Sequence, residues 1–425
     1  MKLMVVGGGG REHAIIRKLK ENPEIERIYA LPGNGGIAAD AECVGIAATD
    51  IDGVVRFARD NMIDFAVVAP DDPLAMGCVD RLHAIGLPCF GPEAKAAQIE
   101  ASKVFAKDLM KKYNIPTARY ETFSNAKEAE AYALAGSFPV VVKADGLALG
   151  KGVLICQDAD EAKAAIKSIM LDKQFGESGS RVVIEEFLEG PEVSVLAFTD
   201  GKVNKPMVSS MDHKRAQDND QGLNTGGMGT IAPNPYYTPE VAERCMQEIF
   251  LPTIAAMNAE NRPFRGCLYF GLMITKDGPK VIEYNCRFGD PETQVVLPLL
   301  KSDLFTIMRS CECGTLASTP VEFSDGAACC VILASGGYPE KYEKGKAIQM
   351  DEAEDEPNVR VFHSGTALKD ATLYTSGGRV LGVTATAPDL RSAVRDAYAA
   401  AEKIHFDGMF MRRDIGAKAL KIIEE

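Results

Sequence analysis

A short apolar strand that runs into glycines and then into an amphipathic helix constrains the fold of this chain more than any other feature. Residues 2–6 form the predicted strand, residues 7–10 are all glycine, and the helix extends to about Asn22. Strand, glycine turn and helix N-terminus together build an anion site, because the first N–H groups of a helix have no partner within it. Such units pack as a parallel sheet covered by helices.

A second glycine loop indicates which kind of anion this layer binds. The strand at 27–30 runs into Leu-Pro-Gly-Asn-Gly-Gly at 31–36. A dinucleotide-binding motif would carry its third glycine where Glu12 stands, and an acidic residue at the end of this strand. Both features are missing, so the sequence favours a small molecule that bears a phosphate. Strands at 64–68 and 87–92 complete the parallel layer.

A third glycine-rich loop, at 145–152, lies between two predicted strands. The strand at 138–143 ends in Lys143, and residues 153–156 continue as a strand after the loop. A P-loop would need Ser or Thr after its lysine and then a helix, but a glycine and a strand follow here. We therefore interpret the loop as a cover over the phosphates of ATP, with Lys143 beneath it.

The next segment is expected to contain a strand pair and a long polar loop. Residues 181–188 and 192–197 are predicted to pair as antiparallel strands. Residues 210–229 show no predicted secondary structure, and long loops of this kind inside compact domains are usually functional or disordered. The charged residues and glycines concentrated in this loop favour a function.

Polar residues line one side of the strand predicted at 281–288. Side chains alternate across a strand, so Glu283, Asn285 and Arg287 share a face. A carboxylate and an amide oxygen suit a hard cation, and an arginine suits an oxyanion. The alternative is the solvent-facing side of a half-buried strand. The carboxylates in the turn at 289–294 favour a metal–phosphate site.

The composition excludes several classes of protein. A net charge of −13 argues against a nucleic-acid surface. No run of ~18 apolar residues is present for a membrane span, and the apolar stretch at 3–6 is too short for a secretory signal. The eleven cysteines include no C-x2-C pair, so we expect reduced thiols in a cytoplasmic protein.

The last hundred residues carry no recognisable catalytic constellation. Strands at 327–333, 359–362 and 378–385, followed by a helix that Asp389 caps, predict an α+β domain. A chain of 425 residues is too long for one ordinary core, and its length suggests about three domains.

Together these motifs resemble the phosphoribosylamine–glycine ligases, which are ATP-grasp enzymes of purine biosynthesis. The most specific motif is Arg287-Phe-Gly-Asp-Pro-Glu-Thr293. The resemblance extends over essentially all 425 residues. In chain order, the supporting motifs are Gly9-Gly-Arg-Glu-His-Ala14, Pro32-Gly-Asn34, Lys143-Ala-Asp-Gly146, Gly150-Lys-Gly152, Asp212-His-Lys-Arg215 and Asn224-Thr-Gly-Gly-Met-Gly229.

The resemblance implies an α/β and α+β multidomain fold with three parts. These are a parallel Rossmann-like domain at 1–101, an ATP-grasp domain at 102–322 with a mobile lid at about 120–190, and a small α+β domain at 323–425. It also implies that the carboxylate of glycine attacks the γ-phosphate of ATP to give a glycyl phosphate. The amine of 5-phosphoribosylamine then displaces phosphate and forms an amide.

The same resemblance sets the expected cofactor and partners. ATP is a co-substrate, and Mg²⁺ or Mn²⁺ is the expected cofactor. The small-molecule partners are ATP, glycine and 5-phosphoribosylamine. We expect a cytoplasmic monomer without nucleic-acid or membrane partners.

The resemblance also assigns site residues. Glu283 and Asn285 are the expected metal ligands, and Arg287 is expected to bind the glycine carboxylate, since arginine binds carboxylates in a bidentate way. The catalytic set further contains Asp212, His213, Lys214 and Arg215, of which the last three are expected to stabilise the acyl phosphate. The expected ATP contacts are Lys103, Lys143, Gly146, Gly150, Lys151, Gly152, Glu185, Glu186, Leu188 and Glu192. The expected contacts of the phosphorylated amine and of glycine are Gly9, Gly10, Arg11, Glu12, Gly33, Asn34, Pro70, Asp71, Asn224, Thr225, Gly226, Gly227, Asp290, Pro291 and Glu292.

Three positions depart from the family pattern. Leu149 replaces the usual alanine in the loop over the phosphates, Asp71-Asp72 replace Glu-Ala, and Leu223 replaces a proline. The departures leave every proposed phosphate and metal ligand in place.

Three other functions compete with the ligase. A sister ATP-grasp ligase would use another amine or acid. A catalytically silent nucleotide-binding regulator would be expected to lose Glu283, Asn285 or Lys143, and all three are present. An NAD-dependent oxidoreductase would rest on the first glycine loop alone and conflicts with Glu12 and Asn34.

Overall fold

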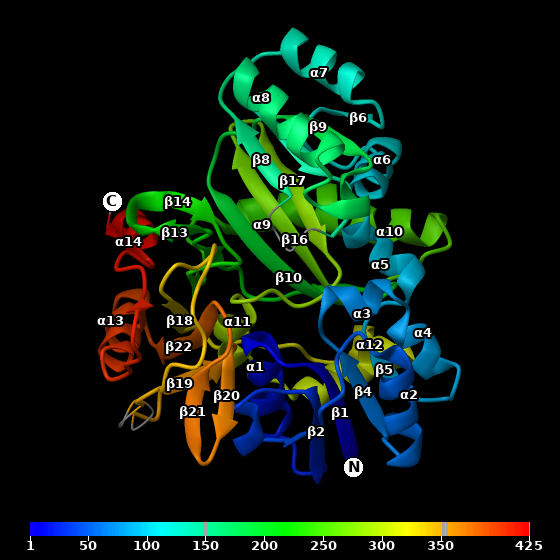
Figure 1. Ribbon diagram of the computed structural model, residues 1–425. Coiled ribbons are helices and arrows are strands. Elements are labelled where there is room, and N and C mark those ends of the chain that lie inside the picture. The colour runs from blue at the N-terminus through cyan, green and yellow to red at the C-terminus, as the bar shows by residue number, and fades with distance from the viewer. Residues whose placement is uncertain (148–151, 351–352, 354–355, 425) are drawn as a thin grey trace.

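The N-terminal part of the chain is a five-stranded parallel sheet, at the bottom of Figure 1. This computed structural model describes residues 1–147, 152–350, 353 and 356–424. The strand order is β3-β2-β1-β4-β5, and the predicted parallel layer is confirmed. The strands are β1 (Lys2–Gly7), β2 (Arg27–Pro32), β3 (Glu42–Cys43), β4 (Phe65–Val68) and β5 (Cys89–Phe90).

The strand order of this sheet fixes where a ligand binds. The chain leaves β1 for β2 and β3 on one side and then crosses to β4 and β5 on the other. Ligands of such sheets bind outside the carboxyl ends of the strands, at this reversal. The loops after β1, β2 and β4 therefore face one edge. The helices of this layer are α1 (Gly10–Leu19), α2 (Ile51–Asp60), α3 (Asp71–Ala75), α4 (Cys78–His83) and α5 (Ala94–Ala101).

A four-stranded antiparallel sheet forms the centre of the molecule, in the order β11-β10-β16-β17. Helix α6 lies beside it and begins after Ser102, whose Oγ accepts from Phe105 N at 3.1 Å, as predicted for an N-cap. The elements are α6 (Lys103–Lys112), β10 (Glu192–Asp200), β11 (Asn204–Pro206), α9 (Pro239–Cys245), η5 (Met246–Phe250), α10 (Leu251–Ala259), β16 (Arg265–Thr275), β17 (Gly278–Asn285) and α12 (Leu304–Cys313).

A separate layer forms the top of Figure 1, and we call it the lid. It is an antiparallel sheet in the order β6-β9-β7-β8, on which two helices pack. Its buried side chains form a hydrophobic cluster of their own. The limits of about 120–190 for a mobile lid stay a prediction. The elements are β6 (Tyr120–Phe123), α7 (Ala126–Ala135), β7 (Val140–Ala144), β8 (Val153–Cys156), α8 (Ala159–Ile166), η2 (Lys167–Leu171), η3 (Gly176–Gly179) and β9 (Val182–Glu186).

The predicted pairing of 181–188 with 192–197 is wrong. Strand β9 lies in the lid sheet, whereas β10 lies in the central sheet between β11 and β16. The chain passes between the sheets next to Gly190, whose φ is +150° and where a Cβ would approach Ile274 O to 2.2 Å. Two strands with a glycine between them can form a hairpin or can belong to two different sheets. The local sequence pattern is the same in both cases, so it could not distinguish them.

The C-terminal part is a mixed α/β layer whose sheet recruits strands from the middle of the chain. The strand order is β12 (Met211–Asp212), β15 (Gly229–Ala232), β18, β22 and β19, and β23 pairs with β18. Its elements are α11 (Thr293–Leu299), η6 (Leu316–Ser318), β18 (Ala327–Ser335), β19 (Val359–His363), β20 (Thr366–Lys369), β21 (Thr372–Thr375), β22 (Arg379–Ala387), α13 (Leu390–Ala401), β23 (Met409–Phe410) and α14 (Ala417–Glu424).

The expectation of a structureless loop at 210–229 is also wrong. This segment supplies β12 (Met211–Asp212) and β15 (Gly229–Ala232) to the C-terminal sheet. Between them it forms a hairpin of β13 (Arg215–Gln217) and β14 (Gln221–Asn224), joined by η4 (Asp218–Asp220). The sequence did not predict these strands because the segment is polar, and because β12 and β13 are too short, at two and three residues, to show an alternating pattern.

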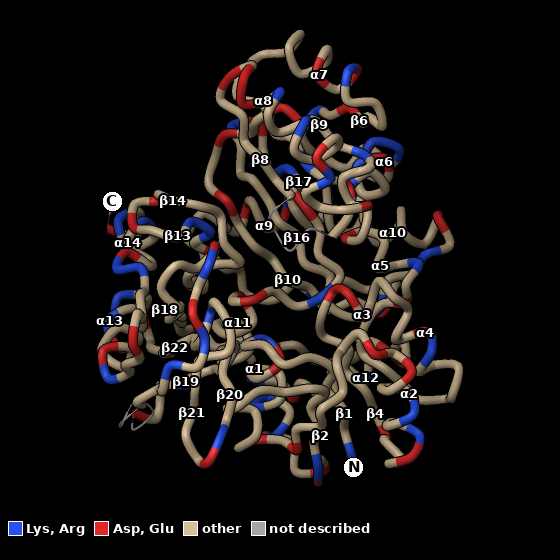
Figure 2. Tube along the Cα trace, in the orientation of Figure 1, with Lys and Arg blue, Asp and Glu red and all other residues tan. Residues whose placement is uncertain are grey.

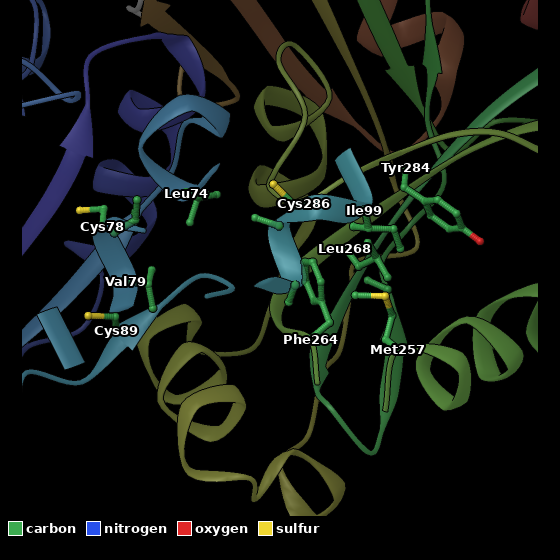
Figure 3. Packing of buried hydrophobic residues seen from close by; sticks show 14 of the residues in the cluster. Leu74, Cys78, Val79, Cys89, Ile99, Met257, Phe264, Leu268, Tyr284 and Cys286 are labelled. Atoms are coloured by element: carbon green, nitrogen blue, oxygen red, sulfur yellow. The ribbon is translucent and has the colours of Figure 1, made fainter. Parts of the chain in front are cut away.

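The hydrophobic cores connect the N-terminal and central parts. Figure 3 shows part of one cluster, which includes Leu74 and Val79 of the N-terminal layer as well as Phe264 and Leu268 of the central part. A second cluster joins the other face of β1 to α11, α12 and β18. The edge of the N-terminal sheet is thereby held against the end of β17, where the candidate site lies.

Surface properties agree with the composition. Basic and acidic residues are interspersed along the chain rather than separated onto two sides (Figure 2). All eleven cysteines are free thiols. Among the described residues, no helix is both long and apolar enough to cross a membrane.

We expect Ile184→Ala to destabilise the lid because Ile184 is fully buried in the lid core. Creating this cavity should cost roughly 2–5 kcal/mol. Hydrogen exchange should then become faster across β6, β7 and β9, while β10 and β16 stay protected. Ile155→Ala is the matched control, since Ile155 is 37% exposed on β8 of the same sheet. Equal effects of the two substitutions would contradict a lid with its own core.

Candidate active site

The candidate site lies where the lid, the end of β17 and the open edge of the N-terminal sheet meet. The central group on the lid side is the half-buried carboxylate of Glu283. Its Oε1 lies 3.7 Å from Lys214 Nζ. Burial alone would raise the pKa of Glu283, but the charges of Lys214, Lys143 and Lys103 outweigh burial and hold this pKa below its ordinary value. Glu283 therefore stays ionised.

A buried chain of charges links the lid to α6. Glu185 on β9 forms an ion pair at each oxygen, with Lys143 at 3.0 Å and with Lys107 at 3.1 Å. Lys143 Nζ also donates to Ile282 O at 3.1 Å, and Lys107 Nζ donates to Thr117 Oγ1 at 2.8 Å. Burial lowers the pKa of Lys107 to about 8, against the opposing effect of Glu185.

Lys103 joins the same region from the start of α6. Its Nζ donates to Gly146 O at 3.0 Å, and its backbone N–H donates to Asp145 O. Burial lowers the pKa of Lys103. Asp145 also accepts from Ser102 Oγ at 2.9 Å and from Arg181 at 2.6 Å, and so ties the glycine loop to the N-terminus of α6.

The glycine loop itself is only partly described. Gly146 and Gly152 border it, and Ala144 N donates to Gly152 O. The expected ATP contacts Gly150 and Lys151, and the departure at Leu149, lie outside the described residues.

The remaining expected nucleotide contacts lie along the crossing between lid and central sheet. Glu186 pairs with Arg119 at 2.8 Å and faces Lys280 at 3.9 Å. Leu188 is half-buried just beyond β9. Glu192 at the start of β10 pairs with Lys214 Nζ at 3.2 Å. Of these, Glu192 is the one in direct contact with the Lys214–Glu283 pair.

The predicted strand of 281–288 ends earlier than expected, because β17 stops at Asn285. Arg287 therefore lies beyond the strand, and alternation does not place it. Its Nη2 nevertheless donates to Asn285 Oδ1 at 3.0 Å, so the two residues lie on one side. Arg287 Nη2 also pairs with Glu100 at 2.9 Å, and Glu100 accepts from Cys286 N at 2.7 Å.

Glu283 and Asn285 fit a hard divalent cation through the chemistry of their donors. The carboxylate of Glu283 stays ionised, and Asn285 offers an amide oxygen. In the described part of the chain, no group of three or more His, Cys, Asp or Glu residues is arranged to hold a metal. Two protein oxygens suit Mg²⁺ bound mainly through phosphate oxygens and water.

The first glycine loop is braced by charges from its own helix and from the 289–294 turn. Glu12 accepts from Gly9 N at 2.6 Å and from Arg11 Nε at 2.6 Å. Arg11 Nη1 donates to Phe288 O at 3.2 Å, and Arg11 N donates to Asp290 Oδ2 at 3.3 Å. Gly10 is closely packed here, because a Cβ would approach Gln294 Nε2 and Ser364 Oγ to 2.6 Å. Arg11 thus lies between this loop and the turn.

Asn34 does not present its side chain to a ligand, contrary to the expected phosphate contact. Its Nδ2 donates to Gly8 O at 2.9 Å and to His363 O at 2.7 Å, and its Oδ1 accepts from Gly36 N and Ile37 N. Both polar atoms of the Asn34 side chain thus bond backbone groups. The role of this side chain is to hold the loop in place rather than to bind phosphate.

The neighbouring expected substrate contacts frame the same edge. Gly33 has a φ of +71° and packs closely against Cys43. Pro70 is the N-cap of α3, which begins at Asp71. Burial lowers the pKa of Arg287, but the charges of Glu100 and then of Asp71 help to raise it above its ordinary value.

The turn after β17 contacts several other parts of the chain through its side chains. Asp290 Oδ1 accepts from Gln294 at 2.8 Å and lies 3.4 Å from Arg379 Nη2. Glu292 Oε1 accepts from Tyr269 OH at 2.9 Å. Pro291 lies against Gly227, where a Cβ would approach Pro291 Cδ to 2.5 Å.

The segment at 224–227 is held against this turn. Thr225 Oγ1 donates to Lys214 O and accepts from Gly227 N at 3.0 Å. Gly226 O accepts from Arg379 at 2.7 Å. Asn224 pairs across the hairpin with Arg215. Arg379 thus connects Gly226 and Gly227 to Asp290, because its Nη1 donates to the carbonyls of all three.

Asp212 lies below this segment with one oxygen buried and without a hydrogen-bond partner in the described part of the chain. Burial, and then the charge of Glu292, raise the pKa of Asp212 well above its ordinary range. The charge of Glu192 raises the pKa of Lys214. Asp212 and Lys214 thus remain candidate catalytic groups.

His213 and Arg215 are not brought to the site, in contrast to the expectation. Gly416 N donates to His213 Nε2 at 3.2 Å, and His213 Nδ1 lies 3.1 Å from Gly229 O. Both ring nitrogens are therefore engaged with backbone. Arg215 Nη1 donates to Gly222 O within the hairpin. His213 lies between β12 and β13, and its ring is held by the backbone of Gly229 and Gly416.

Sequence reasoning missed four residues that hold the site. Lys107 could have been found, because it is four residues after Lys103 and so lies on the same helix face. Glu100 and Tyr269 carry no local signal, since their partners are far along the chain. Arg379 lies in the C-terminal part, whose sequence showed no recognisable group of catalytic residues.

We expect His213 to make the protein sensitive to acid. Burial, and then the charge of Arg412, lower its pKa to about 4 from 6.5, so the neutral ring stabilises the fold fully above pH 6.5 and this stabilisation disappears between pH 6.5 and 4. The loss should be roughly 3 kcal/mol. Urea midpoints measured from pH 7 to 4 should fall less in His213→Gln than in wild type.

His405→Gln is the matched control, because His405 is exposed. Its urea midpoints should follow those of wild type. A His213→Gln profile that matches wild type would contradict the structural role of His213.

Three family models match the chain and together cover most of it. Residues 1–100 match the N domain of phosphoribosylglycinamide synthetase, residues 101–293 its ATP-grasp (A) domain, and residues 328–418 its C domain. The predicted fold class is thereby confirmed.

Individual relatives agree over nearly the full length. The phosphoribosylamine–glycine ligase of Halalkalibacterium halodurans is 48% identical over 421 residues, which are 99% of this chain and 97% of that protein. A bifunctional purine biosynthetic protein of Schizosaccharomyces pombe is 47% identical, and the chain spans about half (53%) of its length.

Solved structures place the chain in the same family. The phosphoribosylamine–glycine ligase of Thermotoga maritima has a TM-score of 0.86 and 35% identity, over 98% of this chain and 100% of that one. A biotin carboxylase domain from Hydrogenobacter thermophilus shares the fold, with a TM-score of 0.73 at 17% identity, over 96% of this chain and 91% of that one. On these matches, the chain belongs to the phosphoribosylamine–glycine ligase family.

Proposed function

We propose that this chain joins glycine to 5-phosphoribosylamine at the expense of ATP, giving glycinamide ribonucleotide, ADP and phosphate in purine biosynthesis. The observation that carries the proposal is the ionised Glu283 beneath the lid, with Lys103, Lys143 and Lys214 around it. Three cations and one carboxylate suit the polyphosphate of ATP together with a divalent metal. The family supplies the identity of the two molecules to be joined.

The first step transfers the γ-phosphoryl group to the carboxylate of glycine. Phosphoryl transfer depends on positioning and on neutralising charge more than on a covalent protein nucleophile. Lys103 and Lys143 would approach the phosphates from α6 and β7, and Lys214 from the segment after β12. Arg287, whose Nε is buried and without a hydrogen-bond partner in the described residues, would bind the glycine carboxylate.

Glu283 and Asn285 would hold a divalent cation, which we propose to be Mg²⁺ or Mn²⁺. When bound, such a cation neutralises charge on the β- and γ-phosphates. Asn285 Oδ1 accepts from Arg287, so the same oxygen connects the metal side to the glycine side.

The second step forms the amide. The amine of 5-phosphoribosylamine attacks the carbonyl carbon of glycyl phosphate, and phosphate leaves with the bridging oxygen. We propose that the N-terminus of α1 and Arg11 bind the 5-phosphate, since helix N-termini bind anions. Lys214 would stabilise the charge that develops on the acyl phosphate. The attacking amine can lose its proton to departing phosphate or to water.

We further propose that domain boundaries fall near residues 101 and 322, that the lid closes on ATP, and that the protein is a cytoplasmic monomer. The separate lid core supports the lid assignment. Similar proteolysis of the lid with and without ATP would contradict closure.

The proposed function is tested by measuring ATP hydrolysis and amide formation while each substrate is omitted in turn. Phosphoribosylamine can be generated during the assay from ribose 5-phosphate and ammonia. We expect amide only when ATP, glycine and phosphoribosylamine are all present. Full ATP turnover without glycine and without phosphoribosylamine would exclude the ligase.

We expect Glu283→Gln to raise the KM for metal-bound ATP at least about tenfold, because it removes an anionic oxygen ligand. Steady-state kinetics at varied Mg²⁺ measure this change. Glu121→Gln on the exposed side of β6 is the matched control and should behave like wild type. Unchanged Mg²⁺ dependence of Glu283→Gln would refute the metal assignment.

We expect Arg287→Lys to raise the KM for glycine by about tenfold or more, while the KM for ATP changes little, because lysine cannot form the bidentate contact. Arg265→Lys is the control, since Arg265 is exposed and donates to Glu312 O. An unchanged KM for glycine would show that another group binds the carboxylate.

A further inference from the structure

One side chain of the C-terminal layer reaches into the substrate loops. Arg379 is the first residue of β22, and its Nη1 donates to Gly226 O at 2.7 Å, to Asp290 O at 2.9 Å and to Gly227 O at 3.3 Å. Its Nη2 lies 3.4 Å from Asp290 Oδ1. These contacts all run from the C-terminal layer to the segment at 224–227 and to the turn after β17.

We propose that Arg379 is a positioning residue for phosphoribosylamine, which holds the 224–227 segment, the 289–292 turn and the N-terminus of α1 in one arrangement. The proposal rests on the proposed function, because it names the substrate that this arrangement receives. It gives the C-terminal layer a direct part in the ligase site.

Both backbone polar groups of Gly226 bond side chains of the C-terminal layer. Its carbonyl accepts from Arg379, and its N–H donates to Tyr338 OH at 3.1 Å. The guanidinium lies so close that a Cβ on Gly226 would be 2.9 Å from Arg379 Cζ. Gly227 next to it has a φ of +114°, which favours glycine. Arg379 therefore contacts the carbonyls of both glycines in this turn.

Asp290 extends the contact to the opposite layer. One of its oxygens faces Arg379, and the other accepts from Arg11 N in the first turn of α1. Two interactions thus connect β22 to the helix N-terminus proposed to bind the 5-phosphate. Burial lowers the pKa of Arg379, but the charge of Asp290, together with those of nearby acidic groups, outweighs burial and raises this pKa above its ordinary value.

An arginine is needed for this geometry. Its planar guanidinium carries five N–H donors in a fixed arrangement, so one side chain can bond several carbonyls and a carboxylate at once. Lysine has a flexible point charge, which keeps the attraction to Asp290 but does not fix three carbonyls. The strand β22 is paired on both sides through its backbone, so its fold does not require this side chain.

The test compares Arg379→Ala and Arg379→Lys with Arg360→Ala. Arg360 lies on β19 of the same layer, and its guanidinium donates to Pro357 O and Val359 O. Steady-state kinetics give the KM for each substrate, and hydrogen exchange reports on 224–229 and 289–292 without any substrate. Melting temperatures identify variants that simply fail to fold.

We expect Arg379→Ala to raise the KM for phosphoribosylamine about tenfold or more, with the KM for ATP within about twofold of wild type. Hydrogen exchange should become faster at 224–229. Arg379→Lys should show the same pattern more weakly, and it serves as the folded variant if the alanine protein aggregates. Arg360→Ala should match wild type in both measurements.

Two results would overturn the inference. One is an unchanged KM for phosphoribosylamine together with unchanged exchange at 224–229. The other is an equal rise in all three KM values with a lowered melting temperature, which is the pattern of a general structural defect. Because exchange is measured without substrates, it tests the positioning role even if wild-type protein forms no amide and the proposed function fails.

Discussion

The arrangement of this site depends on keeping several ammonium groups close together beneath the lid. Lys103, Lys107 and Lys143 repel one another, and Glu185 holds two of them through its two oxygens. Lys214 is shared by Glu192 and Glu283 in the same way. Alternating cations and carboxylates keep the lysines near each other, which is the condition for binding a polyphosphate.

That condition requires distant parts of the chain to meet. The lysines come from α6, from the lid and from the segment after β12, while Glu283 comes from β17. The N-terminal sheet is joined to β17 through shared hydrophobic clusters, and the C-terminal sheet includes strands from the middle of the chain. The three parts form one site because two clusters join them, although the C-terminal layer also has a cluster of its own. The lid has its own cluster and is the part best suited to move.

Sequence-based prediction succeeded where the interactions are local and failed where they connect residues far apart in the chain. Ser102 as an N-cap and the parallel layer at the start of the chain were predicted correctly, because both depend on local patterns. Asn34 and His213 were assigned to ligands by motif, yet their side chains bond backbone brought close by the tertiary fold. The contact of Arg379 spans 153 residues to Gly226, and no local pattern records it.

The central claim is that ATP phosphorylates the carboxylate of glycine before the amide forms. It is tested most directly with glycine that carries ¹⁸O in its carboxylate. If a glycyl phosphate forms, the bridging oxygen leaves with phosphate, so one ¹⁸O should appear in inorganic phosphate for each amide made. Phosphate without ¹⁸O, formed in step with the amide, would contradict this account.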